Sequence, residues 1–275
     1  MADPRDLKFF PSDMTLVDQY LRRRIDTGKE GFIKDIKLYE YEPWLLPHVN
    51  NDLFGEKEWF YFVKRTLKAG KTPNRKVLGR GGSIVGTWTT SGSKEAILGR
   101  NKVVIGHKAE LSYYKDVKGQ VKGDSTGWCM TEYWLASKND EFQELVLCYI
   151  RGKKKQVKNV SSYSGTNRAF APRGDIIARV DPSHLKFFPT DLKLVEHYLR
   201  NRVDTDKDGF IKDIKLYEQE PWLLPHVKND QFVEKGWFYF VKRSCGSDNK
   251  ILRMVPGRGG SDGGTWKKNS RTTNM

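Results

Sequence analysis

Residues 7–26 read LKFFPSDMTLVDQYLRRRID, and residues 185–204 read LKFFPTDLKLVEHYLRNRVD. The likeness continues without a gap over residues 7–88 and 185–266, at an offset of 178, and about 55 of these 82 positions are identical. A period this long is too large for a solenoid or propeller repeat. The pattern therefore indicates duplication of a domain.

The two copies are unequal in length. The first continues for about 60 residues after Trp88, whereas the second stops nine residues after Trp266. We therefore expect a complete domain over residues 1–151, a polar linker without periodicity over 152–184, and a truncated second copy over 185–275. Without the strands that follow the repeat, the second copy is expected to be only a partial domain, because an isolated strand edge is marginally stable.

Charge is concentrated in one part of the first copy. The 275-residue chain has a formal net charge of +15, and residues 64–122 carry 14 Lys and Arg against three acids, which accounts for +11. Such an excess favours a polyanionic partner, either nucleic acid or a membrane surface, over an ordinary solvated surface. No apolar run is long enough to cross a bilayer, and the N-terminus has no signal-peptide h-region. Because the sequence also lacks an amphipathic cationic helix, we expect no membrane partner.

Three cysteines (Cys129, Cys148 and Cys245) are widely spaced and form no CxxC pair. Neither a zinc knuckle nor a disulfide framework is indicated, and reduced intracellular thiols are expected.

Local patterns predict short helices and many strands. Ser12 is placed to cap a helix over residues 13–25, with Leu16, Val17 and Leu21 on one face. The aromatic run WFYFVKR at residues 59–65 predicts a strand. From residue 83 to residue 135, strand-like runs alternate with Gly-containing turns.

Two motifs resemble ligand sites but lack a required residue. Residues 204–215, DTDKDGFIKDIK, resemble a calcium loop, yet its twelfth position is Lys215 rather than a bidentate carboxylate. The GKT at residues 70–72 lacks the leading glycine of a phosphate-binding loop, because that position is Arg65. The five histidines have no metal-ligand spacing, and no nucleophile is paired with a base. We expect no metal, no cofactor and no enzymatic activity.

The basic region has the composition of a DNA-binding surface. Its first half supplies cations that can neutralise phosphates (Lys64, Arg65, Lys68, Lys71, Arg75, Lys76 and Arg80). It is followed by GTWTTSGSK at residues 86–94, a glycine-flanked, hydroxyl-rich run suited to a strand edge in the major groove. Trp88 within it is equally well interpreted as a core anchor or as a contact residue.

Eight motifs in order resemble the plant NAC-domain transcription factors across the whole first copy. They are similar to the family's FHPTDEELVxxYL, PWxLP, GExEWYFF, PNR, YWKATG, VGxKKxLVFYxG, TxWxMHEYRL and WVLCRIY. Here they read FFPSDMTLVDQYL (9–21), EPWLLP (42–47), GEKEWFYF (55–62), PNR (73–75), GTWTTSG (86–92), VIGHKAELSYYK (104–115), TGWCMTEYWL (126–135) and LVLCYI (145–150).

The resemblance implies an α+β fold, with a twisted antiparallel sheet flanked by a few short helices, and double-stranded DNA as ligand. It places DNA contacts at Arg75, Lys76, Arg80, Trp88, Thr89, Thr90, Ser91, Gly92, Lys94 and Lys108. Thr89 stands where the family has Lys after Trp. Losing one charge-assisted contact costs on the order of 1.5–3 kcal/mol if nothing replaces it.

The resemblance also implies dimerisation through the N-terminal segment, which here comprises Lys8, Phe9, Phe10, Pro11 and Thr15. The family's Arg–Glu pair falls on Lys8 and Thr15, and on Lys186 and Lys193, so neither copy keeps it. An exposed pair contributes only about 0–1 kcal/mol, so dimerisation is weakened rather than excluded.

Two modes of action stay open. The chain is expected in the nucleus as a DNA-binding regulator, pairing with other NAC-domain proteins or with its own second copy in an intrachain pseudo-dimer. Alternatively, it dimerises with full-length relatives and titrates them, with weak DNA binding of its own.

Overall fold

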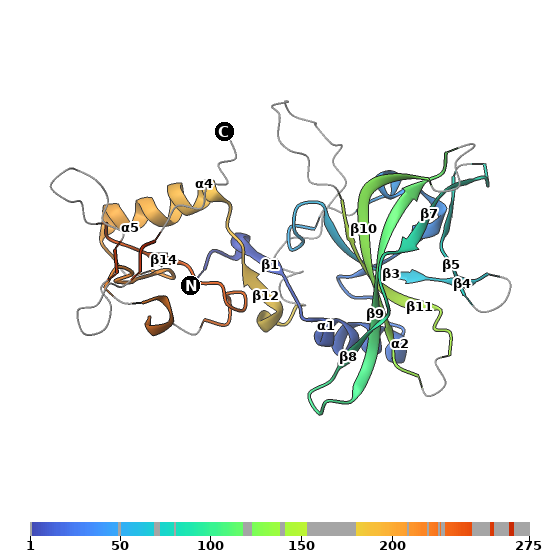
Figure 1. Cartoon of the computed structure of the whole chain (residues 1–275), viewed down its shortest axis with the longest axis horizontal. Helices are drawn as coiled ribbons and strands as arrows, with labels where there is room; N and C mark the ends of the chain where they lie inside the picture. The colour runs from blue at the N-terminus through green and yellow to red at the C-terminus, as the bar shows by residue number, and fades with distance from the viewer. Residues whose placement is uncertain are drawn as a thin grey trace. The chain divides into compact units, whose positions relative to one another are not determined.

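The computed structural model describes residues 2–48, 51–68, 72–79, 81–117, 123–137, 141–152, 180–207, 209–218, 220–224, 226, 229–243, 254–255 and 264–266. The chain divides into two compact units (Figure 1). We call Lys8–Leu185 the sheet unit, and Met1–Leu7 together with Lys186–Met275 the repeat unit.

The helix of the sheet unit is continuous through α1 (Asp13–Thr15), η2 (Leu16–Leu21) and α2 (Arg22–Thr27), with η2 wound as a π-helix. Ser12 Oγ accepts a hydrogen bond from the Thr15 amide at 3.2 Å, which confirms the predicted N-cap. The helix ends at Gly28, whose φ of 65° lies in the left-handed region that glycine adopts without strain.

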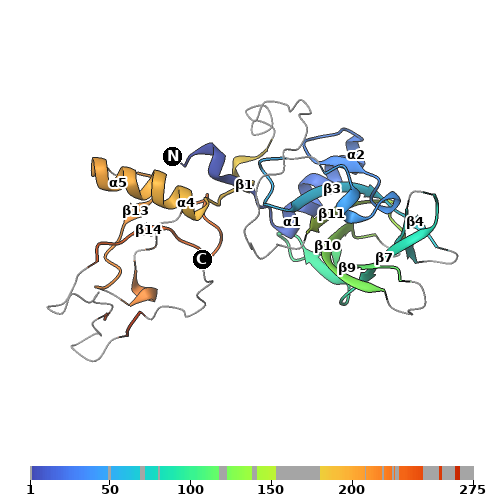
Figure 2. The same cartoon turned by 90° about the horizontal axis from the view of Figure 1, so that it is seen from above.

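The eight-stranded sheet has the strand order β2-β3-β11-β10-β9-β7-β6, with β8 also paired to β9. Figure 2 shows β3, β11, β10, β9 and β7 in this order across the unit. Their bounds are β2 (Lys34–Ile36), β3 (Glu58–Lys64), β6 (Lys76–Leu78), β7 (Ile84–Thr90), β8 (Glu95–Leu98), β9 (Val104–Lys115), β10 (Asp124–Leu135) and β11 (Leu145–Arg151). The predicted α+β class is confirmed, with one correction: the sheet is mixed, because β2 and β3 run parallel.

Short elements complete the chain up to residue 184, and η1 among them belongs to the repeat unit. They are η1 (Pro4–Asp6), β1 (Leu7–Phe9), η3 (Leu38–Glu40), η4 (Pro43–Leu45), β4 (Thr66–Leu67), β5 (Pro73–Asn74) and η5 (Pro182–His184). β4 pairs with β5 in a separate two-stranded ribbon. η5 lies within the segment predicted to be linker, of which residues 153–179 fall outside the described residues.

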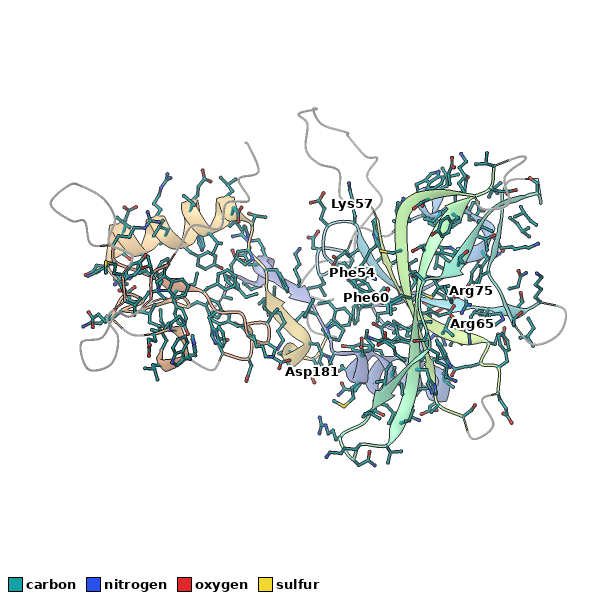
Figure 3. All side chains as sticks on the ribbon, viewed as in Figure 1. Phe54, Lys57, Phe60, Arg65, Arg75 and Asp181 are labelled. Carbon is teal, nitrogen blue, oxygen red and sulfur yellow. The ribbon has the colours of Figure 1, made fainter. Side chains whose placement is uncertain are left out.

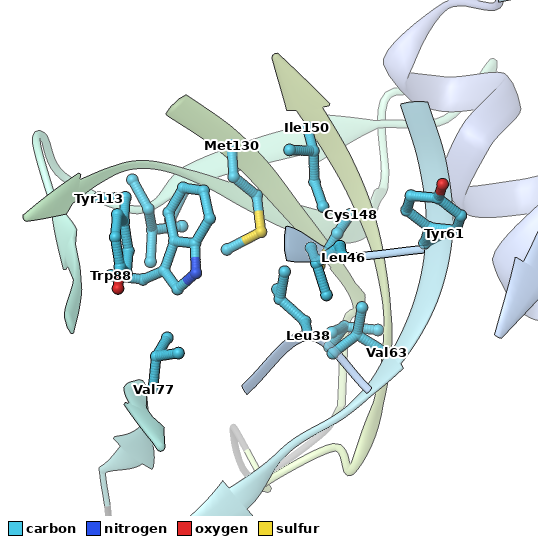
Figure 4. Packing of buried hydrophobic residues seen from close by; sticks show 13 residues of the cluster. Leu38, Leu46, Tyr61, Val63, Val77, Trp88, Tyr113, Met130, Cys148 and Ile150 are labelled. Atoms are coloured by element: carbon cyan, nitrogen blue, oxygen red, sulfur yellow. The ribbon is translucent and has the colours of Figure 1, made fainter. Parts of the chain in front are cut away.

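One face of the sheet carries the main core. Val77, Trp88, Leu111, Met130 and Ile150 pack there with residues from the preceding loops (Figure 4). Strand residues alternate between faces, so their neighbours along each strand point to the opposite face. That opposite face is apolar at β3 and β11 and polar at β7 and β9.

The helix covers the apolar part of the second face. Val17 lies against Gly106 of β9, where an added Cβ would come within 2.7 Å of a Val17 methyl carbon. The Tyr133 hydroxyl donates to Asp13 at 2.8 Å. Phe9 packs edge-on against Phe60, with ring centroids 5.0 Å apart. The helix therefore leaves the β7–β9 end of this face open.

A buried ion-pair cluster links the strands on the core face. The fully buried Glu132 carboxylate accepts from Arg65 at 2.8 Å and from Arg75 at 2.7 Å. The Tyr39 hydroxyl also donates to Glu132, at 3.3 Å. Figure 3 shows Arg65 and Arg75 close together beside the sheet. Two cations on one buried carboxylate offset the cost of desolvating it.

The repeat unit reproduces the early elements of the sheet unit. It contains β12 (Leu185–Phe187) from Lys186 on, together with α4 (Asp191–Lys193), η6 (Leu194–Leu199), α5 (Arg200–Thr205), β13 (Lys212–Asp213), η7 (Pro221–Leu223) and β14 (Tyr239–Phe240). β13 pairs in parallel with β14, as β2 does with β3. β13 and β14 are shorter than their counterparts, and β14 has two residues where β3 has seven.

Candidate nucleic-acid interface

Strand β7 is fixed to the sheet by its inward-facing residues. The indole of Trp88 is buried in the core, 5.3 Å from the Tyr113 ring (Figure 4). Gly86 lets the Tyr113 phenol pass, because a Cβ at this position would lie 2.1 Å from its oxygen. Trp88 is thus the core anchor, one of its two predicted interpretations, and its side chain is not available on the surface.

The residues that follow Trp88 are exposed. Thr89 and Thr90 still pair with Ser112 and Leu111 of β9, and the Ser91 amide donates to the Glu110 carbonyl at 2.9 Å. Pairing to β9 then resumes at β8, from Glu95 opposite Lys108. Residues 91–94 therefore interrupt a single sheet edge, and we call Thr89–Lys94 the edge loop.

The outer side of the edge loop is open in the described part of the chain. β6 covers β7 only as far as Thr87, and the Trp88 amide donates to the Arg75 carbonyl at 3.0 Å. Beyond that bond, no described strand pairs with the outer edge. The loop thus presents backbone groups, three hydroxyls before Gly92, and the Ser93 hydroxyl and Lys94 to solvent.

The predicted cations differ in their surroundings. Lys76 lies opposite Thr87 in the β6–β7 pair, on the open face of the sheet, and Lys94 is exposed. Arg75 is bound to Glu132, and its side chain is only 18% exposed. Arg80 lies outside the described residues.

Lys108 is held by two acids. Its amine lies 3.0 Å from Asp13 and 3.2 Å from Glu95, and the hydrogen bond to Asp13 raises its pKa. Lys108 keeps its proton at any physiological pH. Its charge, however, is largely neutralised by these carboxylates, so it adds little to the local positive potential.

Two cations near this edge, and Arg151 on β11, were not predicted from the sequence as DNA contacts. Arg100 and Lys102 are exposed in the turn between β8 and β9. Arg151 donates to Glu110 at 2.7 Å on the open face of the sheet, beside Thr131. The Gly-Arg-Asn-Lys run at residues 99–102 is a turn signal that points to the first two. The position of Arg151 on the open face could be found only from the strand register.

The predicted dimerisation residues lie on two kinds of surface. Phe9 and Thr15 are buried, with Phe9 also edge-on to Tyr20 at 5.2 Å. The Lys8 amine donates to the Asp52 carbonyl at 2.6 Å. Phe10 is exposed and Pro11 half-buried. The pairing role of this segment stays a prediction.

Other classes of site find no support in the described residues. No group of three or more His, Cys, Asp or Glu side chains there is arranged to hold a metal ion. No helix in this part of the chain is both long enough and apolar enough to span a bilayer. Cys129 and Cys148 are free thiols, and burial raises the pKa of Cys148 well above its usual value.

The family model described as "No apical meristem (NAM) protein" matches residues 4–135 and 182–275, which together exceed half of the chain. The chain belongs to the NAC-domain family. It is similar to NAC domain-containing protein 6 of Arabidopsis thaliana, with 36% identity over 166 residues, covering 60% of this chain and 48% of that protein.

Two other relatives show the same pattern. NAC domain-containing protein 19 of Arabidopsis thaliana is 32% identical over 195 residues, covering 66% of this chain and 58% of the relative. Transcription factor JUNGBRUNNEN 1 of Arabidopsis thaliana is 38% identical over 134 residues, covering 47% and 45%. This NAC-domain chain thus spans about half the length of the curated relatives that it matches.

Proposed function

We propose that this NAC-domain chain binds double-stranded DNA sequence-specifically and regulates transcription in the nucleus, with the edge loop in the major groove. The observation that carries the proposal is the loop itself: Thr89–Lys94 is exposed and follows a strand anchored by Trp88. The naming of one relative as a transcription factor also supports it.

The physical argument has two parts. A strand edge fits the major groove, and hydroxyl groups can bond both to phosphates and to base edges. Lys76, Lys94, Arg100 and Lys102 lie on β6, the edge loop and the following turn, and would supply the sequence-independent attraction to phosphates. We therefore assign recognition of the base sequence to the hydroxyls of the edge loop, and sequence-independent affinity for DNA to these cations.

Lys94 tests the phosphate contribution. We expect Lys94→Ala to weaken binding to all duplexes alike and to lower the slope of log affinity against log salt by about 1. The matched control is Lys29→Ala, which removes an exposed cation just after α2, outside the basic region of residues 64–122. Equal losses for the two variants in fluorescence anisotropy would contradict the assignment of Lys94.

Thr89 tests the position of the loop. Because Thr89 stands where the family resemblance places Lys, we expect Thr89→Lys to strengthen DNA binding about 10- to 100-fold at low salt. Gln19→Lys adds the same charge on the exposed side of η2 and is expected to change affinity much less. If both variants gain equally, net charge explains the effect and the edge loop does not lie on DNA.

Arg75 needs a separate measurement, since it has a structural partner. Arg75→Ala leaves Glu132 with one cation instead of two, so lost DNA binding by this variant is informative only if its thermal melting is unchanged. Should melting fall together with binding, Arg75 is a positioning residue rather than a DNA contact.

A second candidate function is titration of full-length relatives through pairing. Thr89 favours it, since the edge loop lacks the family's Lys and would bind DNA weakly. Pull-down of NAC-domain proteins by this chain, with no DNA shift at either low or high salt, would support the titrating role over the DNA-binding role.

A further inference from the structure

Each unit contains the N-terminal arm of the other copy. We define arm 1 as residues 2–7 and arm 2 as residues 180–185, which are equivalent segments 178 positions apart. Arm 1 belongs to the repeat unit, with residues 186–275, whereas arm 2 belongs to the sheet unit, with residues 8–179. The copies have therefore exchanged arms.

The two arms have the same local structure. Arm 1 forms η1, in which Asp3 accepts from the Arg5 amide at 2.8 Å, and arm 2 forms η5, in which Asp181 accepts from the Ser183 amide at 2.9 Å. Each arm then accepts one equivalent backbone bond. Phe188 donates to the Asp6 carbonyl and Phe10 donates to the His184 carbonyl, both at 2.8 Å.

The side chains at the end of each arm differ. Asp6 of arm 1 is 2% exposed. Its carboxylate binds the Lys193 amine and accepts from the Tyr198 hydroxyl at 2.7 Å. The same hydroxyl accepts from the Asp3 amide at 3.2 Å. The second copy thus offers a buried carboxylate both a cation and a donor.

The site for arm 2 has no lysine at the position of Lys193, and the charge of Arg23 acts there on Tyr20 instead. His184 stands at the position equivalent to Asp6, and its Nδ1 lies 2.8 Å from the Tyr20 hydroxyl. The position equivalent to Lys193 is Thr15, whose hydroxyl bonds to Ser12 at 2.9 Å. In the first copy, the arm residue His184 therefore meets the neutral hydroxyl of Tyr20.

Pairing of like copies would disturb this match. Arm 1 on the first copy would bury Asp6 beside Tyr20, with Thr15 in place of Lys193. Arm 2 on the second copy would place His184 beside Lys193, leaving that lysine only Asp181, the equivalent of Asp3, as a carboxylate partner. A buried carboxylate without its cation is strongly unfavourable, so the first combination is the more heavily penalised.

We infer that the first copy pairs with the second copy of the same chain in preference to another first copy. The residues that determine this preference are Asp6 and Lys193, together with their equivalents His184 and Thr15. Joining both copies in one chain raises their effective concentration to about the millimolar range, which favours the intrachain pair over dimers of two chains. The inference rests on the proposed pairing of NAC-type copies and does not depend on DNA binding.

The test swaps the two charges by mutation in the full chain and then measures amide hydrogen exchange. Asp6→Lys and Lys193→Asp should each speed exchange at the Phe188 amide at least about tenfold, because the arm loses its ion pair. The double variant should recover most of the protection. Asp6→Asn, which keeps the shape, should give an intermediate loss, and Lys207→Asp, at an exposed position just after α5, should give none.

Light scattering tests the same-chain part, for which we expect the 31.8 kDa monomer. A stable two-chain species of the wild type, or a double variant no better protected than the single variants, would overturn the inference. Failure of the wild type to bind any DNA would instead contradict the proposed DNA function and leave the hydrogen-exchange result intact.

Discussion

The helix of the first copy and the helix of the second copy have nearly the same sequence and the same local structure, yet they differ in burial. Val17 and Leu21 are fully buried, whereas their equivalents Val195 and Leu199 are 55% and 44% exposed. The N-caps match: Ser12 accepts from Thr15 at 3.2 Å, and Thr190 accepts from Lys193 at 3.3 Å.

The aromatic clusters match as well. Phe9 lies 5.0 Å from Phe60, and Phe187 lies 5.0 Å from Phe238. What differs is the sheet, because η2 packs against β9, β10 and β11, and the described part of the repeat unit has no strands in their place. Caps and local clusters are thus encoded within the repeat, while burial of the helix requires the strands that follow it.

We expect the largest difference in unfolding free energy between substitutions of Arg65 and of its equivalent Arg243. Arg65 is buried against Glu132, and Arg243 is exposed. We expect Arg65→Ala to lower the free energy of unfolding of the sheet unit by about 3–5 kcal/mol, since it removes one partner of a buried pair. Arg243→Ala should cost less than about 0.5 kcal/mol in the same urea titration. Similar costs at both positions would contradict the comparison.

Leu21 and Leu199 test the burial of the helix directly. Leu21→Ala leaves a cavity beneath the helix and should cost about 2–5 kcal/mol. Leu199→Ala removes a side chain that is already partly in water and should cost under about 1 kcal/mol. A large effect of Leu199→Ala on unfolding would mean that another part of the molecule covers this face in solution.

Gly86 lies in the strand that precedes the edge loop, and Gly264 is its equivalent in the second copy. An added Cβ at Gly86 would meet the Tyr113 oxygen, whereas nothing in the described part of the chain lies within 4 Å of one at Gly264. We expect Gly86→Ala to cost about 1–3 kcal/mol through overpacking. It should also weaken DNA binding, which anisotropy can measure. Gly264→Ala serves as the control, with no change expected in either measurement.

Ser12 and Thr190 should behave alike, because each caps its helix through the same bond. Replacement by Ala should cost about 0.5–2 kcal/mol in each copy. Hydrogen exchange of the first helical turn can follow the two positions in one sample. A loss confined to Ser12→Ala would show that the second helix is held by something other than its cap.

His48 gives the smallest effect, a dependence on pH. Its ring stacks on the rings of Trp59 and Trp128, with ring centroids 3.9 Å and 5.7 Å apart. Desolvation by burial lowers the pKa of His48 below 6.5. The unfolded chain therefore binds a proton more readily than the folded one. Stability should be fully present above about pH 6.5 and fall as the pH drops toward the folded pKa. Replacing His48 with Gln should flatten this dependence in acid titrations, and an unchanged slope would argue against the assignment.

Much of the fold could be predicted from the sequence, because its signals are local. Ser12 and the 13–25 periodicity predicted the helix, and WFYFVKR predicted β3. The ion pairs could not be predicted, since Arg75 and Glu132 lie 57 positions apart and meet only through strand register. For the same reason Arg75 and Lys108 were predicted as DNA contacts without knowledge of the acids that hold them.

We propose that the first copy reads DNA through the edge loop, while the second copy pairs with it and contributes no DNA contacts of its own. Selection from a random duplex pool tests it most directly, using the wild type, a Thr90→Val and Ser91→Ala double variant, and Lys267→Ala, which changes the second-copy position equivalent to Thr89. We predict that the wild type and Lys267→Ala enrich the same motif, and that the edge-loop variant enriches none or an altered one. An unchanged motif with the edge-loop variant, or loss of the motif with Lys267→Ala alone, would contradict the claim.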